Sequence, residues 1–346
     1  MGTTTDRPRN DGIDLLRMTA MLMVVVLHIL GKGGVLGAAP FPSVRAGAAW
    51  LLEAAAYCAV DCYALVSGYV GGRHRWADLA ALWLRVAFYT VGITAAFALL
   101  LPGSVSADNW LRAVCPVLFN QYWYVTAYFC LFCFLPLLEP AVRAMSRRQL
   151  GGTAAGLTVL LSLLPTVFQR DAFGTQAGYH GLWLMAVYVV GAYFGRYGFP
   201  QWLKGFRALL GYGVLTGLTW AVEVVCGSGA LLQYTSPTVL GAGVCLLALF
   251  QGLHLPGWLR RTVAFAAPLS FSVYLIHAQP LVWKYLIADR FASFASHSAP
   301  GLALRVVGTA LAIYVACSLL DLPRAALFRS LRVKDRLRLL EDRLPH

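Results

Sequence analysis

The chain has 346 residues, of which 59% are hydrophobic and only 12% are charged, about half the charged share of a soluble domain. Apolar runs recur along its whole length, which excludes a pair of soluble domains and indicates an integral membrane protein. A formal net charge of +13 would suit nucleic-acid binding, but the sequence carries no nucleic-acid-binding motif. We therefore predict a lipid bilayer and no nucleic acid among its partners.

Apolar windows long enough to cross a bilayer follow one another from the first helix to residue 322. They predict an all-α, polytopic membrane helical bundle of about ten transmembrane helices, with both termini cytoplasmic. In that orientation, most of the Lys and Arg residues lie on the cytoplasmic side, as is typical of membrane proteins. The windows fall at about 13–30, 47–70, 79–101, 120–140, 151–168, 181–199, 207–226, 234–253, 264–288 and 302–322.

The chain divides into a predicted transmembrane domain, residues 1–322, and a basic tail, residues 323–346. Apolar residues repeat at helical spacing in the tail, with Arg and Lys between them: Val333, Leu337, Leu340 and Leu344. This pattern suits an amphipathic cytoplasmic helix on the anionic inner leaflet, although a solvated terminal helix would look the same. We expect a multi-pass protein of the plasma (inner) membrane. Because the loops are short, it should act within the helical bundle or at its faces.

The first apolar window carries two ionisable groups that a simple anchor does not need, Arg17 and His28. Eleven residues at about 100° each place both side chains on one helix face, about 16 Å apart along the axis. Asp14, three residues before Arg17, is within ion-pair reach on the same face. An imidazole near the middle of the membrane is a candidate general base, although a buried structural histidine would give the same pattern.

Other ionisable residues lie inside or beside later windows. Asp61 lies in the second window and needs a partner, for which we expect a histidine or an arginine on another helix. Arg73 and Arg75 follow that window, and Arg85 lies inside the third. Topology alone explains Arg73 and Arg75, whereas guanidinium groups at these places also suit a phosphate-bearing ligand from the cytosol.

Two further segments are candidates for binding or catalysis. Tyr122, Trp123 and Tyr124 stand where an outer aromatic belt is expected, and rings in that arrangement also suit stacking on a sugar. His277 is a second intramembrane histidine, three residues before Pro280. It is either a structural histidine at a proline kink or a residue that orients His28 or the substrate. The Cys-x-x-Cys pair at 130–133 has no second ligand pair, so we predict no metal.

These segments together resemble acyltransferase family 3 membrane proteins. Arg17 and His28 match the family's Arg, ten residues, then His in the first helix, and Ile13–Arg17 resembles its opening. Residues 60–69, 122–136 and 272–277 resemble three further family blocks, in order. Where the family often has Arg-x-x-Arg after its second block, this chain has Arg73-His74-Arg75. The amino-acid sequence of these segments is most similar to the glycan O-acetyltransferase branch.

The resemblance implies transfer of an acetyl or other acyl group from cytosolic acetyl-CoA, as co-substrate, to a hydroxyl of an extracytoplasmic glycan or cell-wall acceptor. It implies His28 as the essential histidine, which would act as a general base or an acyl relay. From their spacing, we expect Asp14 to hold Arg17 in place. By the resemblance, CoA phosphates would be bound by Arg17, Arg73 and Arg85, to which we add Arg75 from its position. From their residue types and positions, our candidates for contact with the acceptor are Asp61, Tyr122, Trp123, Tyr124 and His277. The alternatives are a proton-coupled transporter or flippase that uses His28, Asp61 and His277, and a structural partner in a glycan-assembly complex.

Overall fold

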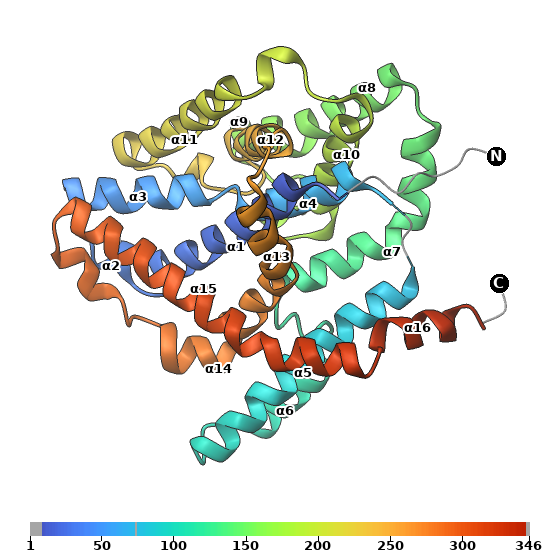
Figure 1. Cartoon of the computed structure of the whole chain (residues 1–346). Coiled ribbons are helices and arrows are strands. Elements are labelled where there is room, and N and C mark those ends of the chain that lie inside the picture. The colour runs from blue at the N-terminus through green and yellow to red at the C-terminus, as the bar shows by residue number, and fades with distance from the viewer. Residues whose placement is uncertain (1–8, 73–74, 344–346) are drawn as a thin grey trace. The chain divides into compact units, whose positions relative to one another are not determined.

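The computed structural model describes residues 9–72 and 75–343, and within them it contains helices and no strand (Figure 1). The all-α prediction is therefore confirmed for the described chain. Seven helical stretches are long and apolar enough to cross a membrane. They are α1 (Asp11–Leu30), α3 (Val44–Ala56) with α4 (Ala59–Val70), α5 (Trp76–Leu100), α7 (Trp123–Ala144), α8 (Arg147–Thr158) through α9 (Leu164–Phe168), α11 (Phe206–Cys226) and α15 (Ala299–Ser330).

The other three predicted windows fall on helices that are shorter or broken. α10 (Gly181–Tyr197) and α12 (Pro237–Gln251) are shorter than a full span. α13 (Gly257–His277) is followed by a 60° bend into Pro280–Ile287, which comprises α14 (Pro280–Val282) and a π-helical turn, η5 (Trp283–Ile287). The count of ten and the cytoplasmic termini therefore stay predictions. The remaining α-helices are α2 (Val35–Ala38), α6 (Ala107–Val114) and α16 (Val333–Glu341).

The chain forms two compact units, each assembled from three segments. Unit 1 comprises Met1–Val24, Trp50–Arg73 and Phe134–Pro268, and unit 2 comprises Val25–Ala49, His74–Cys133 and Leu269–His346. In unit 1, α4 packs against both α10 and α12. A Cβ at Gly191 would lie 2.1 Å from the Leu65 carbonyl oxygen, and one at Gly68 would lie 1.9 Å from the Tyr188 carbonyl oxygen. Glycine thus lets α4 and α10 pack backbone against backbone.

In unit 2, the C-terminal helix α16 packs along α5. Asp78, in the first turn of α5, forms ion pairs with Lys334 and Arg338, and Arg75 forms them with Glu341 and Asp342. These carboxylates hold the pKa of the half-buried Arg75 guanidinium above its ordinary value, chiefly through the hydrogen bond to Glu341. Figure 1 shows α16 continuing from the end of α15. α15 itself runs on to Ser330, so the boundary expected at residue 322 lies inside this helix.

Candidate functional site

The candidate site in unit 2 lies at a break in the helix after His277. Pro280 has no N–H to continue the helix, and the Gln279 side chain caps the next one instead. The Gln279 Oε1 atom accepts hydrogen bonds from the backbone N–H groups of Leu281 at 2.6 Å and Val282 at 3.1 Å. His277 therefore ends α13, and Trp283 begins the π-helical turn beyond the bend. Such π-turns are frequent at functional sites.

The two intramembrane histidines contact one another directly. His28 Nδ1 lies 2.7 Å from His277 Nε2, and the ring centroids are 4.9 Å apart. His277 is 1% exposed, whereas His28 is only partly buried. This contact suits a His277 that orients His28, and the bond of His277 to the Val273 carbonyl suits a structural histidine, so both roles stay predictions.

A backbone carbonyl determines which ring nitrogens carry protons. His277 Nδ1 lies 2.6 Å from the Val273 carbonyl oxygen, which can only accept a hydrogen bond. Nδ1 of His277 therefore donates, and in the neutral ring its Nε2 carries the lone pair. His28 Nδ1–H must then be the donor to His277, which leaves the lone pair of His28 on Nε2. Among the described residues, that atom has no hydrogen-bond partner.

Aromatic side chains and one cation surround His28. Trp283 meets the imidazole edge-on, with centroids 4.9 Å apart and planes at 80°, and Tyr274 lies at 6.5 Å. The Lys32 ammonium lies 5.7 Å from the Trp283 ring centroid. Tyr122 is buried and donates its hydroxyl to the Leu275 carbonyl oxygen at 2.7 Å, so it anchors the last turns of α13. Tyr122 therefore supports the segment of α13 just before His277.

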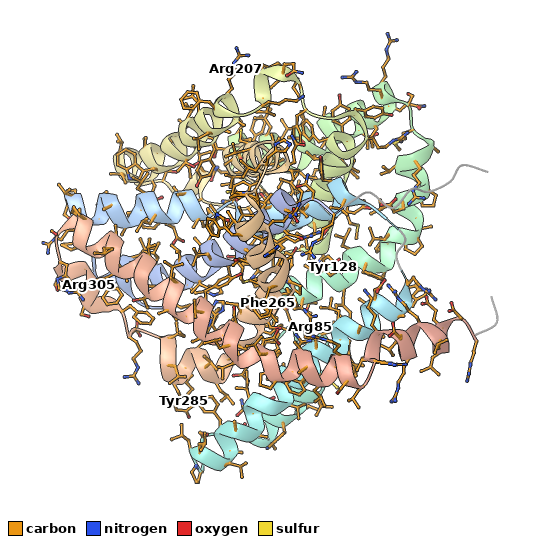
Figure 2. The ribbon with its side chains drawn as sticks, in the orientation of Figure 1. Arg85, Tyr128, Arg207, Phe265, Tyr285 and Arg305 are labelled. Atoms are coloured by element: carbon orange, nitrogen blue, oxygen red, sulfur yellow. The ribbon has the colours of Figure 1, made fainter. Side chains whose placement is uncertain are left out.

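The aromatic segment continues along α7. Trp123 packs edge-on against Tyr124 at 5.7 Å, and Tyr124 stacks on Tyr128 at 6.3 Å. Figure 2 labels Tyr128 on this helix. The geometry suits either of the two interpretations left open, an aromatic belt or a stacking platform.

In unit 1, Asp14 forms the ion pair that its spacing predicts. Asp14 Oδ1 accepts from Arg17 Nη1 at 2.8 Å, and Asp14 Oδ2 accepts from Arg9 Nε at 2.5 Å. The Tyr63 hydroxyl also donates to the Arg17 carbonyl oxygen at 2.7 Å. The Arg17 side chain keeps about a third of its surface exposed, 36%, so its guanidinium has donors to spare for a ligand. Arg17 and His28 both belong to the single helix α1.

The prediction that a histidine or an arginine pairs with Asp61 is wrong. Asp61 is fully buried in unit 1, and its Oδ1 atom accepts from the indole Nε1–H of Trp183 at 2.9 Å. The sequence does not predict this pair, because a tryptophan in an apolar segment is ordinarily interpreted as a core residue and not as a hydrogen-bond donor. The Oδ2 atom of Asp61 is buried without a hydrogen-bond partner among the described residues.

Arg85 lies beside a buried charge cluster in unit 2. Asp321 and Arg324 form two parallel hydrogen bonds of 2.7 Å, and the Tyr89 hydroxyl also donates to Asp321. Asp321 and Arg324 neutralise one another, whereas Arg85, within electrostatic reach of both, makes no ion pair of its own with a described residue. Figure 2 labels Arg85 on α5. The cluster thus carries one guanidinium charge in excess, as an anion site requires.

The other two arginines of the predicted phosphate site have different surroundings. Arg75 is engaged by the acidic end of α16, and Arg73 lies outside the described residues. Sequence reasoning missed Trp283, Tyr89, Asp321 and Arg324. An Asp three residues before an Arg at the end of the last apolar window was a usable signal for the buried pair. In residues 9–72 and 75–343, no group of three or more His, Cys, Asp or Glu side chains is placed to hold a metal ion.

Comparison with known families identifies the family of the chain. The family model described as an acyltransferase domain, acyltransferase 3, matches residues 10–321, nearly the whole chain. The protein belongs to the acyltransferase 3 family. Searches of curated proteins and of solved structures found no match. Family membership supports an acyltransferase built on a membrane helical bundle and does not favour the transporter alternative.

Proposed function

We propose that this protein transfers an acetyl group, or a related acyl group, from cytosolic acetyl-CoA to a hydroxyl of an extracytoplasmic glycan or cell-wall component. The observation that carries the proposal is the free lone pair on His28 Nε2. The hydrogen bond to His277 keeps the lone pair on that atom, and aromatic rings flank the imidazole. The family supplies the reaction class, acyl transfer. The acetyl-CoA donor, the glycan acceptor and a plasma-membrane location are our proposals.

His28 is the proposed base. Its Nε2 takes the proton of the acceptor hydroxyl as the oxygen bonds to the thioester carbonyl carbon. The carbon–sulfur bond then breaks, and the imidazolium returns the proton to the CoA sulfur, so that atoms and charge balance. His277 is a positioning residue, because its hydrogen bond keeps the basic lone pair on Nε2 of His28. The same lone pair also suits a relay in which His28 carries the acyl group.

The donor phosphates are proposed to bind arginines near the cytoplasmic ends of the helices. In unit 2 the candidate is Arg85, whose guanidinium charge is uncompensated in the Asp321–Arg324 cluster. In unit 1 a separate candidate is Arg17, which is ion-paired to Asp14. Arg73 and Arg75 remain candidates, although Arg75 must release Glu341 and Asp342 before it can bind a phosphate. Charge-assisted hydrogen bonds from guanidinium groups are well matched to phosphate oxygens.

Each unit separately offers side chains of the kinds that bind a hydroxyl-rich acceptor. In unit 2, Trp123 and Tyr124 are aromatic rings of the kind that stack on a sugar, and Tyr122, just before α7, is hydrogen-bonded to α13. In unit 1, Asp61 offers Oδ2 as an acceptor for a hydroxyl group. These residue types suit a neutral, hydroxyl-rich ligand.

Reconstitution tests the proposal. Purified protein in proteoliposomes is supplied with acetyl-CoA carrying a labelled acetyl group on the cytoplasmic side and with envelope glycan on the other side. We expect the label to move to the glycan as a base-labile ester and the free thiol of CoA to appear in equal amount. Solute uptake without acetyl-CoA, and no thioester cleavage, would overturn the proposal in favour of a transporter.

A further inference from the structure

The indole Nε1–H of Trp283 is a polar group of the His28 site that takes no part in the proton transfer proposed for His28. This atom is buried and has no hydrogen-bond partner among the described residues. An indole N–H can only donate, and a buried donor without a partner costs free energy. Trp183, by contrast, gives its indole N–H to Asp61. The unpartnered donor of Trp283 therefore stands ready for an acceptor atom that arrives with a substrate.

The Trp283 ring is fixed beside His28. It packs edge-on against the imidazole at 4.9 Å, and the Lys32 ammonium lies over it at 5.7 Å. Two backbone hydrogen bonds tie the turn after α1 to the segment after η5, from Asp289 N–H to the Lys32 carbonyl oxygen at 3.0 Å and from Phe291 N–H to the Gly33 carbonyl oxygen at 2.9 Å. The base and the indole are thus held by connected backbone.

We infer that Trp283 is a catalytic residue whose Nε1–H donates a hydrogen bond to the thioester carbonyl oxygen of the acyl donor. This inference rests on the proposed function. When the acceptor hydroxyl attacks and gives its proton to His28 Nε2, the carbonyl oxygen becomes an oxyanion. Collapse of that intermediate expels the CoA sulfur and restores the carbonyl. A preorganised donor stabilises the oxyanion more than the starting carbonyl, so it lowers the barrier.

The Lys32 ammonium adds to this arrangement. The ammonium lies over the Trp283 ring, which carries the N–H donor. The local electrostatic potential therefore favours a negatively charged oxygen beside that ring. A single base with no oxyanion donor would leave the charge of the intermediate uncompensated in a low-dielectric site. The base, the donor and the cation together supply what an acyl-transfer site needs.

The test compares Trp283→Phe with the wild-type protein in proteoliposomes. Phenylalanine keeps an aromatic ring but lacks the N–H, so we expect kcat to fall about 100-fold while KM for acetyl-CoA changes less than about threefold. The binding affinity for S-acetonyl-CoA, an unreactive ketone analogue, should fall much less than kcat, because its carbonyl oxygen does not become an oxyanion. Benzothienylalanine at position 283 keeps the fused ring without the N–H and should reproduce the loss. Trp258→Phe, at an exposed position of α13, is the matched control and should retain full activity.

The outcomes separate this inference from the proposed function. Full kcat in both Trp283 variants, with His28→Ala inactive, would overturn the role of Trp283 and leave the proposed function standing. Full activity in His28→Ala would contradict the proposed function itself. Loss of activity in Trp283→Phe with full activity in the benzothienylalanine protein would show that ring shape matters and the N–H does not, which also overturns the inference.

Discussion

Nδ1 of His28 lies 2.7 Å from Nε2 of His277, although 249 residues separate the two histidines in the chain. The Val273 carbonyl behind His277 gives this contact a direction, because it requires His277 Nδ1 to donate. The result is a chain of hydrogen bonds that ends in a free lone pair on His28 Nε2. The chemistry proposed for this protein depends on that atom.

Replacing His277 tests whether its hydrogen bond to His28 positions the imidazole. In His277→Phe, the acceptor for His28 Nδ1–H is lost, so the imidazole is free to take the other tautomer or turn away. We expect kcat to fall about 100-fold, with a smaller change in KM for either substrate. In His277→Asn, the amide oxygen can accept from His28 and the amide N–H₂ can donate to Val273, so this variant should recover part of the activity. Equal activity in both variants would argue against a positioning role.

The excess charge at Arg85 predicts a defect in donor binding. Arg85→Ala should raise KM for acetyl-CoA by about 10- to 100-fold, since a hydrogen bond to a charged group contributes about 1.5–3 kcal/mol, with kcat little changed. The effect should be weaker for a donor that lacks the CoA nucleotide phosphates. Arg112→Ala removes an arginine of α6 that pairs with Asp108 on the surface and is the matched control. An unchanged KM in Arg85→Ala would remove Arg85 from the phosphate site.

The buried Asp321–Arg324 pair predicts a stability effect. Asp321→Ala leaves the Arg324 guanidinium buried without its carboxylate, so we expect a loss of about 3–5 kcal/mol in unfolding free energy. The double variant Asp321→Leu with Arg324→Met removes both charges and should recover most of that loss. Thermal unfolding in detergent measures both. Equal destabilisation by the single and the double variant would contradict the assignment of the cost to an unpaired charge.

Close packing of α4 and α10 predicts a cost for any side chain at Gly191. A Cβ there would lie 2.1 Å from the Leu65 carbonyl oxygen, so Gly191→Ala must push the helices apart. We expect a loss of about 1–3 kcal/mol, seen as a lower melting temperature. Gly217→Ala, on α11, has no atom within 4 Å of the new Cβ and should be neutral or slightly stabilising. Similar melting temperatures for the two variants would show that the α4–α10 contact is looser than described.

The site was predictable where spacing along one helix carries the information. Arg17, Asp14 and His28 follow from positions on α1, and the Asp14–Arg17 ion pair is present. Contacts between distant helices were not predictable. His277 was recognised without a definite role, and the Trp183 partner of Asp61 was missed, because an indole N–H leaves no charge pattern in a sequence.

The fold was predictable in class and less so in detail. Hydropathy located the membrane helices but not their interruptions, such as the break between α3 and α4 or the 60° bend after His277. The bend depends on Gln279 capping the next helix, which is a local hydrogen-bonding choice that an apolar window does not reveal. Trp283 was missed for the same reason, since it lies beyond that bend.

The central claim is that His28 Nε2 moves the proton, or carries the acyl group, in transfer from acetyl-CoA. The most direct measurement is the rate of labelled acetyl transfer to glycan by His28→Ala in proteoliposomes, with its melting temperature as the control for folding. The account predicts a folded protein whose transfer rate falls by at least about 100-fold. A folded His28→Ala protein that transfers acetyl groups at the wild-type rate would contradict it.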